Sequence, residues 1–136
     1  MNSPNHQVRE ASCLAVSEIY LRLSQFDPSA FKPYAISLAR ILLTKVKGEP
    51  YYGVRNQSIT ALSHIVKAYK EEVNEVIPDL IDLWFSRLSE NVATVRESAA
   101  IAIVASANTL DLNERVREYI KANILKAKDQ KREAPL

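Results

Sequence analysis

Few side chains in this sequence have the types and spacing that catalysis or metal binding requires. The two histidines, His6 and His64, lie far apart and belong to no HExxH or comparable metal-ligand pattern. The single cysteine, Cys13, lies within an apolar helical segment, where a buried and unreactive thiol is expected. The chain contains no GxSxG nucleophile elbow and no glycine-rich phosphate loop. We therefore expect no catalytic residue, no metal site, no cofactor and no enzymatic activity.

Residues 45–53 are a better candidate for recognition than any residue is for catalysis. This stretch combines Lys45 and Lys47 with the adjacent Tyr51 and Tyr52, and it is four residues longer than its counterpart later in the chain. Exposed tyrosines bury a large contact area at low entropic cost and are enriched at the centres of protein interfaces. We expect these four side chains to contact a partner protein. The alternative is that one tyrosine packs against its own helix.

Composition limits the architecture that can position these residues. The chain has 136 residues, of which 47% are hydrophobic and 25% are charged, with a net charge of +2. It contains only two glycines, and both lie within residues 45–53, so tight β-hairpins and all-β folds are disfavoured. No apolar run approaches the roughly 18 residues of a membrane span, and the chain opens on a polar stretch rather than a signal peptide. We expect a soluble, all-helical protein in the cytoplasm, with the nucleus as the alternative compartment.

The chain repeats a Val-Arg dipeptide followed by a helical segment rich in alanine and serine. The dipeptide begins at Val8, Val54 and Val95, at intervals of 46 and 41 residues. Four, seven and eight residues after each valine stand a small residue, an alanine and a branched apolar residue, which together mark one face of a helix. These positions are Ser12, Ser58 and Ala99; Ala15, Ala61 and Ala102; and Val16, Leu62 and Ile103. Small residues on this face would allow a neighbouring helix to approach closely.

A second type of helix alternates with the first. Ser29 and Asn74 each stand four residues before a proline, Pro33 and Pro78, and serine and asparagine are good N-caps. The pattern predicts helices that begin at these residues, with a bend near the proline, and a further helix from Asn113 that lacks it. In all, it predicts six helices, near residues 6–24, 29–46, 53–70, 74–88, 93–108 and 113–128. The segment 99–107 is apolar on nearly all sides, so we expect it to be covered on several of them.

These features together resemble the HEAT-repeat family, whose repeats are antiparallel helix pairs of about 40–47 residues that stack into a superhelix. The prolines match the family's first helix, and Glu49 and Glu90 stand five residues before a Val-Arg, where the family usually carries an acidic residue. Ser3 occupies that place before Val8, so the acid is missing there. The resemblance implies a right-handed α-solenoid of about three helix pairs, one domain over residues 1–128, followed by a charged and frayed tail over residues 129–136. We expect the chain to be a segment of a longer array or a short protein whose ends are covered by a partner; the alternative is that three helical hairpins, paired in the other phase, suffice.

The resemblance also suggests a role for the repeated arginines. In related solenoids this arginine ties the turn of one repeat to its neighbour, so Arg9, Arg55 and Arg96 are expected to form a ladder with Glu49 and Glu90. Arginine suits this role because its planar guanidinium bridges carboxylates and carbonyls. A basic groove that binds phosphates is the alternative role for these arginines.

The resemblance implies a scaffold that binds another protein through its intra-repeat turns or its concave face. In the similar TOG-type arrays, which bind tubulin, the contacts come from this class of turn, so a cytoskeletal partner such as tubulin is the specific option that we favour. The alternative is a nucleic-acid-binding protein that uses a Lys/Arg surface, although the balanced charge argues against it. We expect no membrane partner. Further repeats or self-association would cover the ends of the array.

Overall fold

The computed structural model describes residues 3–133, except for the side chains of residues 23, 127 and 129–133. This part of the chain is all-helical and contains no β-strand, as predicted. Six helices of eleven or more residues correspond to the six predicted ones. They are α1 (His6–Phe26), α3 (Ala35–Gly48), α4 (Tyr52–Tyr69), α5 (Ile77–Arg87), α6 (Ala93–Ser106) and α7 (Asn113–Glu133). Three short elements stand between them: α2 (Pro28–Phe31) and the 3₁₀ turns Lys32–Tyr34 and Asn74–Val76.

The predicted starts of two helices, at Ser29 and Asn74, were wrong. Ser29 lies inside the short helix α2, and the long helix α3 begins only after the 3₁₀ turn that contains Pro33. Asn74 begins a 3₁₀ turn, and α5 follows it with Pro78 in its first turn. Proline has no amide hydrogen and its ring crowds the preceding turn, which explains why a regular α-helix starts beside the proline rather than four residues ahead of it.

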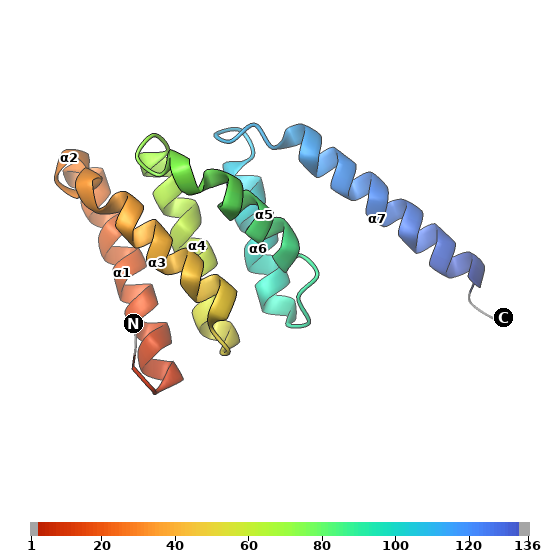
Figure 1. Ribbon diagram of the computed structural model, residues 1–136, viewed down its shortest axis with the longest axis horizontal. Helices are drawn as coiled ribbons and strands as arrows, with labels where there is room; N and C mark the ends of the chain where they lie inside the picture. Colours follow the sequence, from red (N-terminus) through yellow and green to blue (C-terminus); the bar gives the residue numbers. More distant parts are fainter. Residues whose placement is uncertain (1–2, 134–136) are drawn as a thin grey trace. The chain divides into compact units, whose positions relative to one another are not determined.

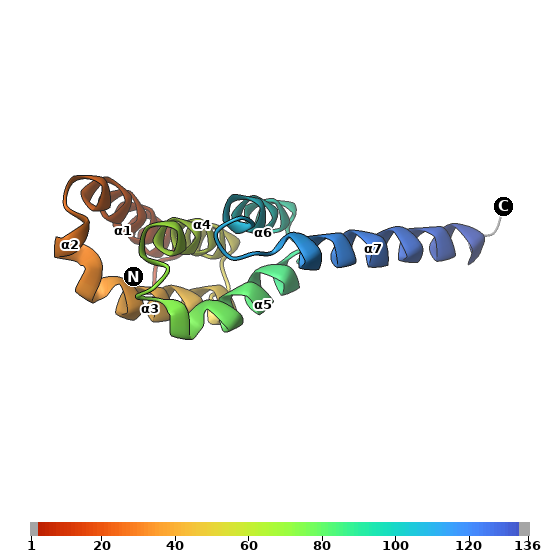
Figure 2. The same cartoon turned by 90° about the horizontal axis from the view of Figure 1, so that it is seen from above.

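The chain divides into two compact units, residues 1–105 and residues 106–136. In the first unit, α1, α4 and α6 lie in one layer, and α3 and α5 lie in a second layer against it (Figures 1 and 2). The second unit contains a single long helix, α7, which continues past the predicted end at residue 128. The backbone of residues 129–133 of the predicted tail belongs to this helix, and their side chains are not described. Residues 134–136 lie outside the described residues.

Helix α4 forms the centre of the first unit. Its apolar residues are almost completely buried: Val54, Ile59, Leu62, Ile65 and Val66. The small side chains of the repeat lie in the same core on α4 and α6, where Ser58, Ala61, Ala99 and Ala102 are buried, whereas on α1 Ser12 is half-buried and Ala15 is exposed. In particular, the Ser58 hydroxyl lies 3.9 Å from the Cys13 sulfur of α1. A larger residue at this position would push the two helices apart.

Helix α6 departs from the prediction that segment 99–107 is covered on several sides. Ile101 and Val104 are 69% and 74% exposed, whereas Ala99, Ala102 and Ile103 on the opposite side are buried. Within the first unit α6 is the last helix of its layer, so no further helix of that unit covers its outer side (Figure 2). The apolar character of the segment therefore does not correspond to complete burial.

Candidate functional site

The connection between α3 and α4 is shorter than the sequence suggests. Helix α3 continues to Gly48 and α4 begins at Tyr52, so Lys45 and Lys47 belong to the last turn of α3. Glu49 caps α3 with its backbone amide bonded to the carbonyl of Lys45, and Tyr51 precedes α4 with extended backbone angles. Neither glycine has a positive φ. The additional residues of this repeat thus lengthen α3 rather than form a long loop.

An ion pair between α1 and the turn holds this connection in place. Arg9 Nε donates to Glu49 Oε2 at 2.9 Å, and Arg9 Nη2 donates to Glu49 Oε1 at 2.6 Å. The same Oε1 accepts the backbone amide of Tyr51 at 3.2 Å. The hydrogen bond from Arg9 lowers the pKa of the Glu49 carboxyl, and the same bond raises the pKa of Arg9. A bidentate pair of this kind fixes both the position and the orientation of the turn.

The same arrangement occurs one repeat later. Arg55 Nη1 donates to the carbonyls of Glu49 and Pro50, and Arg55 Nη2 donates to Glu90 Oε1 at 2.9 Å. Arg9 likewise donates from Nη1 to the carbonyls of Ser3 and Pro4. Each arginine therefore joins the turn before its own helix to the carboxylate of the following turn.

An aromatic cluster lies beside the first of these ion pairs. The Tyr51 ring lies between those of His6 and Tyr52, with ring centroids 4.0 Å and 4.8 Å away. Tyr51 is half-buried, whereas His6 and Tyr52 are exposed. A hydrogen bond with Tyr52 raises the pKa of the Tyr51 hydroxyl. Tyr51 thus packs across to α1, and its neighbour Tyr52 presents its ring to solvent.

The sequence prediction missed His6 as a member of this cluster. His6 stands two residues before Val8, and Tyr52 stands two residues before Val54, so the two occupy the same position in consecutive repeats. Because α1 and α4 lie side by side in one layer, the starts of the two helices come together, and His6 contacts Tyr51, the residue before Tyr52 (Figure 2). The equal positions of His6 and Tyr52 in the repeat were the sequence signal that could have indicated this contact.

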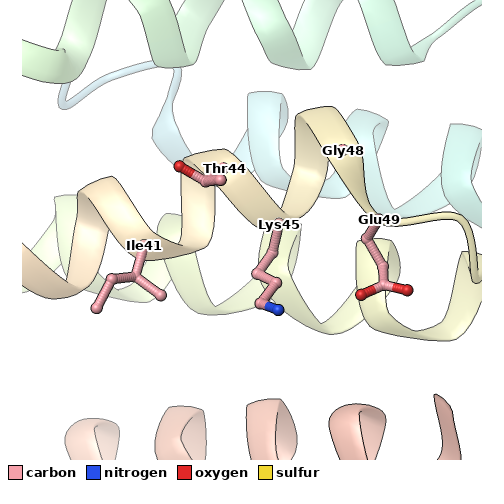
Figure 3. A pocket seen from close by; sticks show the side chains of 5 residues that line it. All are labelled: Ile41, Thr44, Lys45, Gly48 and Glu49. Atoms are coloured by element: carbon pink, nitrogen blue, oxygen red, sulfur yellow. The ribbon is translucent and has the colours of Figure 1, made fainter. Parts of the chain in front are cut away.

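A pocket of about 370 Å³ adjoins the turn and is lined by Ile41, Thr44, Lys45, Gly48 and Glu49. Ile41, Lys45 and Glu49 follow one another at intervals of four residues and point the same way from α3 and its cap (Figure 3). The pocket offers an ammonium group, an aliphatic side chain and a carboxylate that is already paired with Arg9. This set suits contact with a polar peptide surface.

The remaining candidates for chemistry lie apart from this turn. Cys13 is fully buried, as predicted, and burial raises the pKa of its thiol. His64 is half-buried on α4, and its Nδ1 makes no hydrogen bond within the described part of the chain. Among the side chains that the structure describes, no group of three from His, Cys, Asp or Glu could hold a metal ion.

Two further findings concern the chain as a whole. None of the described helices is long and apolar enough to cross a membrane. No protein-family model, no curated protein and no solved structure matches the chain.

Proposed function

We propose that this chain is a non-enzymatic scaffold that binds another protein through one surface at the end of its helix layers. We call it the turn surface, and it consists of His6, Lys45, Lys47, Tyr51 and Tyr52. The proposal includes the HEAT-like, right-handed solenoid implied by the resemblance and a cytoplasmic location. The observation that carries it is the exposed ring of Tyr52 in contact with the half-buried ring of Tyr51, whose backbone amide is bound by a carboxylate that is ion-paired to the neighbouring helix.

The geometry of the turn surface favours binding because little has to be ordered when a partner arrives. Tyr51 already packs between two rings, and the Glu49 carboxylate already fixes the backbone amide of Tyr51. Aromatic side chains with few rotatable bonds lose little conformational entropy on binding, and a preorganised loop loses still less. Lys47 adds an exposed positive charge in the last turn of α3, four residues before Tyr51, which favours an acidic partner surface.

The specific partner that we favour is tubulin. This choice rests on the similarity to TOG-type arrays and on the position of the turn surface at an intra-repeat turn. Contact between the exposed Lys47 and an acidic protein should weaken as salt is added, because the charges are screened over about 8 Å at physiological ionic strength.

The test compares binding of the wild-type chain and the Tyr51→Ala/Tyr52→Ala double variant to purified tubulin. The double variant should bind at least tenfold more weakly, because interface tyrosines commonly contribute a kcal/mol or more each. Tyr34→Ala is the matched control, since Tyr34 is 64% exposed and lies in the 3₁₀ turn before α3 rather than at the turn surface. Circular dichroism should show that both variants remain folded.

Equal binding by the wild type and the double variant would remove the turn surface from the interface. Failure of the wild type to bind tubulin, together with capture of a different protein that depends on both tyrosines, would retain the turn surface and replace the partner. Binding to nucleic acid with a steep salt dependence, unaffected by the tyrosine changes, would instead support the alternative function.

A further inference from the structure

Three arginines, Arg9, Arg55 and Arg96, occupy the same position in the repeat. Within the described residues, one of them has no carboxylate bound to its guanidinium. Arg9 and Arg55 each use Nη1 for two backbone carbonyls and Nη2 for the carboxylate of the next turn. Arg96 begins in the same way, with Nη1 donating to the carbonyls of Glu90 and Asn91. Within the described part of the chain, Arg96 Nε and Nη2 make no hydrogen bond. Arg96 is therefore oriented like the other two but lacks their second partner.

Solvent exposure of the three arginines agrees with this difference. The side chains of Arg9 and Arg55 are 14% and 12% exposed, because the following turn covers them. Arg96, by contrast, is exposed to solvent. A guanidinium already held on one edge by two carbonyls has lost much of its rotational freedom, so a carboxylate can bind its other edge at reduced entropic cost.

The outer side of α6 continues from this guanidinium as an apolar surface. Ala100, Ile101, Val104 and Ala105 line an apolar pocket of about 360 Å³. Of these residues, Ala100 and Val104 stand at the positions of Cys13 and Ser17 on α1, which are both buried, and Cys13 lies against Ser58 of α4. In the interior of the unit, this packing brings Glu10 of α1 against Gly53 of α4, where an added Cβ would stand 2.6 Å from the Glu10 carboxyl carbon. Glu97 occupies the position of Glu10 on α6, one residue after the repeat's arginine.

We propose that this outer side of α6 binds a helix–turn segment of a partner protein with a defined chemistry. The segment carries a carboxylate in its turn and a glycine four residues later, followed by a helix rich in small side chains. The carboxylate binds Nε and Nη2 of Arg96, the glycine accommodates Glu97, and the small side chains cover Ala100 and Val104. Within this chain, Glu49, Gly53 and the start of α4 form such a segment for Arg9 and Glu10.

A second copy of the wild-type chain does not meet these requirements. The place of the carboxylate before α1 is taken by Ser3, and the place of the glycine by Gln7. The backbone nevertheless has the required local geometry, because Ser3 Oγ accepts the amide of Asn5 at 3.2 Å, just as Glu49 Oε1 accepts that of Tyr51 at 3.2 Å. Two substitutions can therefore convert the start of α1 into the proposed ligand.

The experiment uses the Ser3→Glu/Gln7→Gly variant of the full chain. The altered start of α1 in one copy is the ligand, and the outer side of α6 in another copy is the binding site. Sedimentation velocity over a range of concentrations measures the association. This variant should associate head to tail at least tenfold more strongly than the wild type, into open-ended species, because the two contacting surfaces differ. Ser3→Gln/Gln7→Gly is the matched control, since it has the same shape without the charge and should behave like the wild type. Adding Arg96→Gln to the charged variant should return its association to the wild-type level.

Arg40→Ala in the charged variant controls for the loss of any exposed arginine and should leave the association unchanged. The proposal is overturned if the charged variant associates no more strongly than the Ser3→Gln control, or if Arg96→Gln leaves its association intact. It is also overturned if the wild type associates as strongly as the charged variant, because no carboxylate would then be required. The tyrosine variants of the turn surface concern a different surface, so their outcome does not bear on this test.

Discussion

Replacing Leu62 by alanine tests the central position of α4 in the first unit. Leu62 is completely buried on α4, which packs against both α1 and α3. The change removes three carbon atoms at about 0.8 kcal/mol each and leaves a cavity that the close-packed surroundings fill only in part. Buried Leu→Ala changes cost about 2–5 kcal/mol. We expect a loss of about 3–4 kcal/mol in the free energy of unfolding.

The matched control is Ile101→Ala on the outer side of α6. Ile101 is 69% exposed, so it retains only about a third of the roughly 1.5–3 kcal/mol that full burial would provide. Alanine is the better helix former, which offsets part of this loss. The expected loss is therefore about 0.5 kcal/mol or less, although the two substitutions remove similar apolar groups.

Thermal unfolding of both variants can be followed through Trp84, the chain's single tryptophan, which is completely buried on α5. An unfolding entropy of about 2.1 cal/mol/K per residue, applied to the 105 residues of the first unit, gives about 0.2 kcal/mol/K. Leu62→Ala should thus lower Tm by about 15 °C, and Ile101→Ala by 3 °C or less. A loss below about 1 kcal/mol for Leu62→Ala would refute the packing argument. Equal losses would show that the outer side of α6 is covered in solution.

Two further predictions concern titratable groups. The pKa of Glu49 in the folded chain lies below its ordinary value of 4.5, so its contribution to stability is complete above that pH and is lost as the pH falls through the lower folded value. Between pH 6 and pH 3 the urea midpoint should fall further for the wild type than for Glu49→Gln; parallel curves would contradict the ion pair with Arg9. Cys13 is fully buried with a raised pKa, so it should react with a thiol reagent at pH 8 only as fast as the chain unfolds. Fast labelling of the native chain would contradict its burial.

The fold class and the helix count could be read from local signals. The recurrence of Val-Arg with small residues at fixed positions predicted six helices and their order, because helical periodicity is a property of neighbouring residues. The same reasoning failed at Ser29 and Asn74, where good capping residues competed with nearby prolines. The rigid ring, rather than the capping side chain, decides where the regular helix begins.

For the candidate site, sequence reasoning identified the residue types but not which residues contact them. It identified Tyr51 and Tyr52, but it placed them on a long turn that the structure shortens to three residues, Glu49 to Tyr51. It did not associate His6 with the cluster, since a contact between two helices depends on which helices lie side by side.

The sequence alone determined the periodic pattern: helices of two types, arginines at equal positions, and a carboxylate before two of the three Val-Arg helices. Only the tertiary structure decided which donor meets which acceptor. Arg9 and Glu49 stand 40 residues apart in the chain, and their side chains meet because α1 and α4 pack in one layer. The same packing ends at α6, and there Arg96 and the apolar side that carries Ile101 are left exposed. Periodicity is local and can be read residue by residue, whereas the end of a layer depends on which neighbours are present.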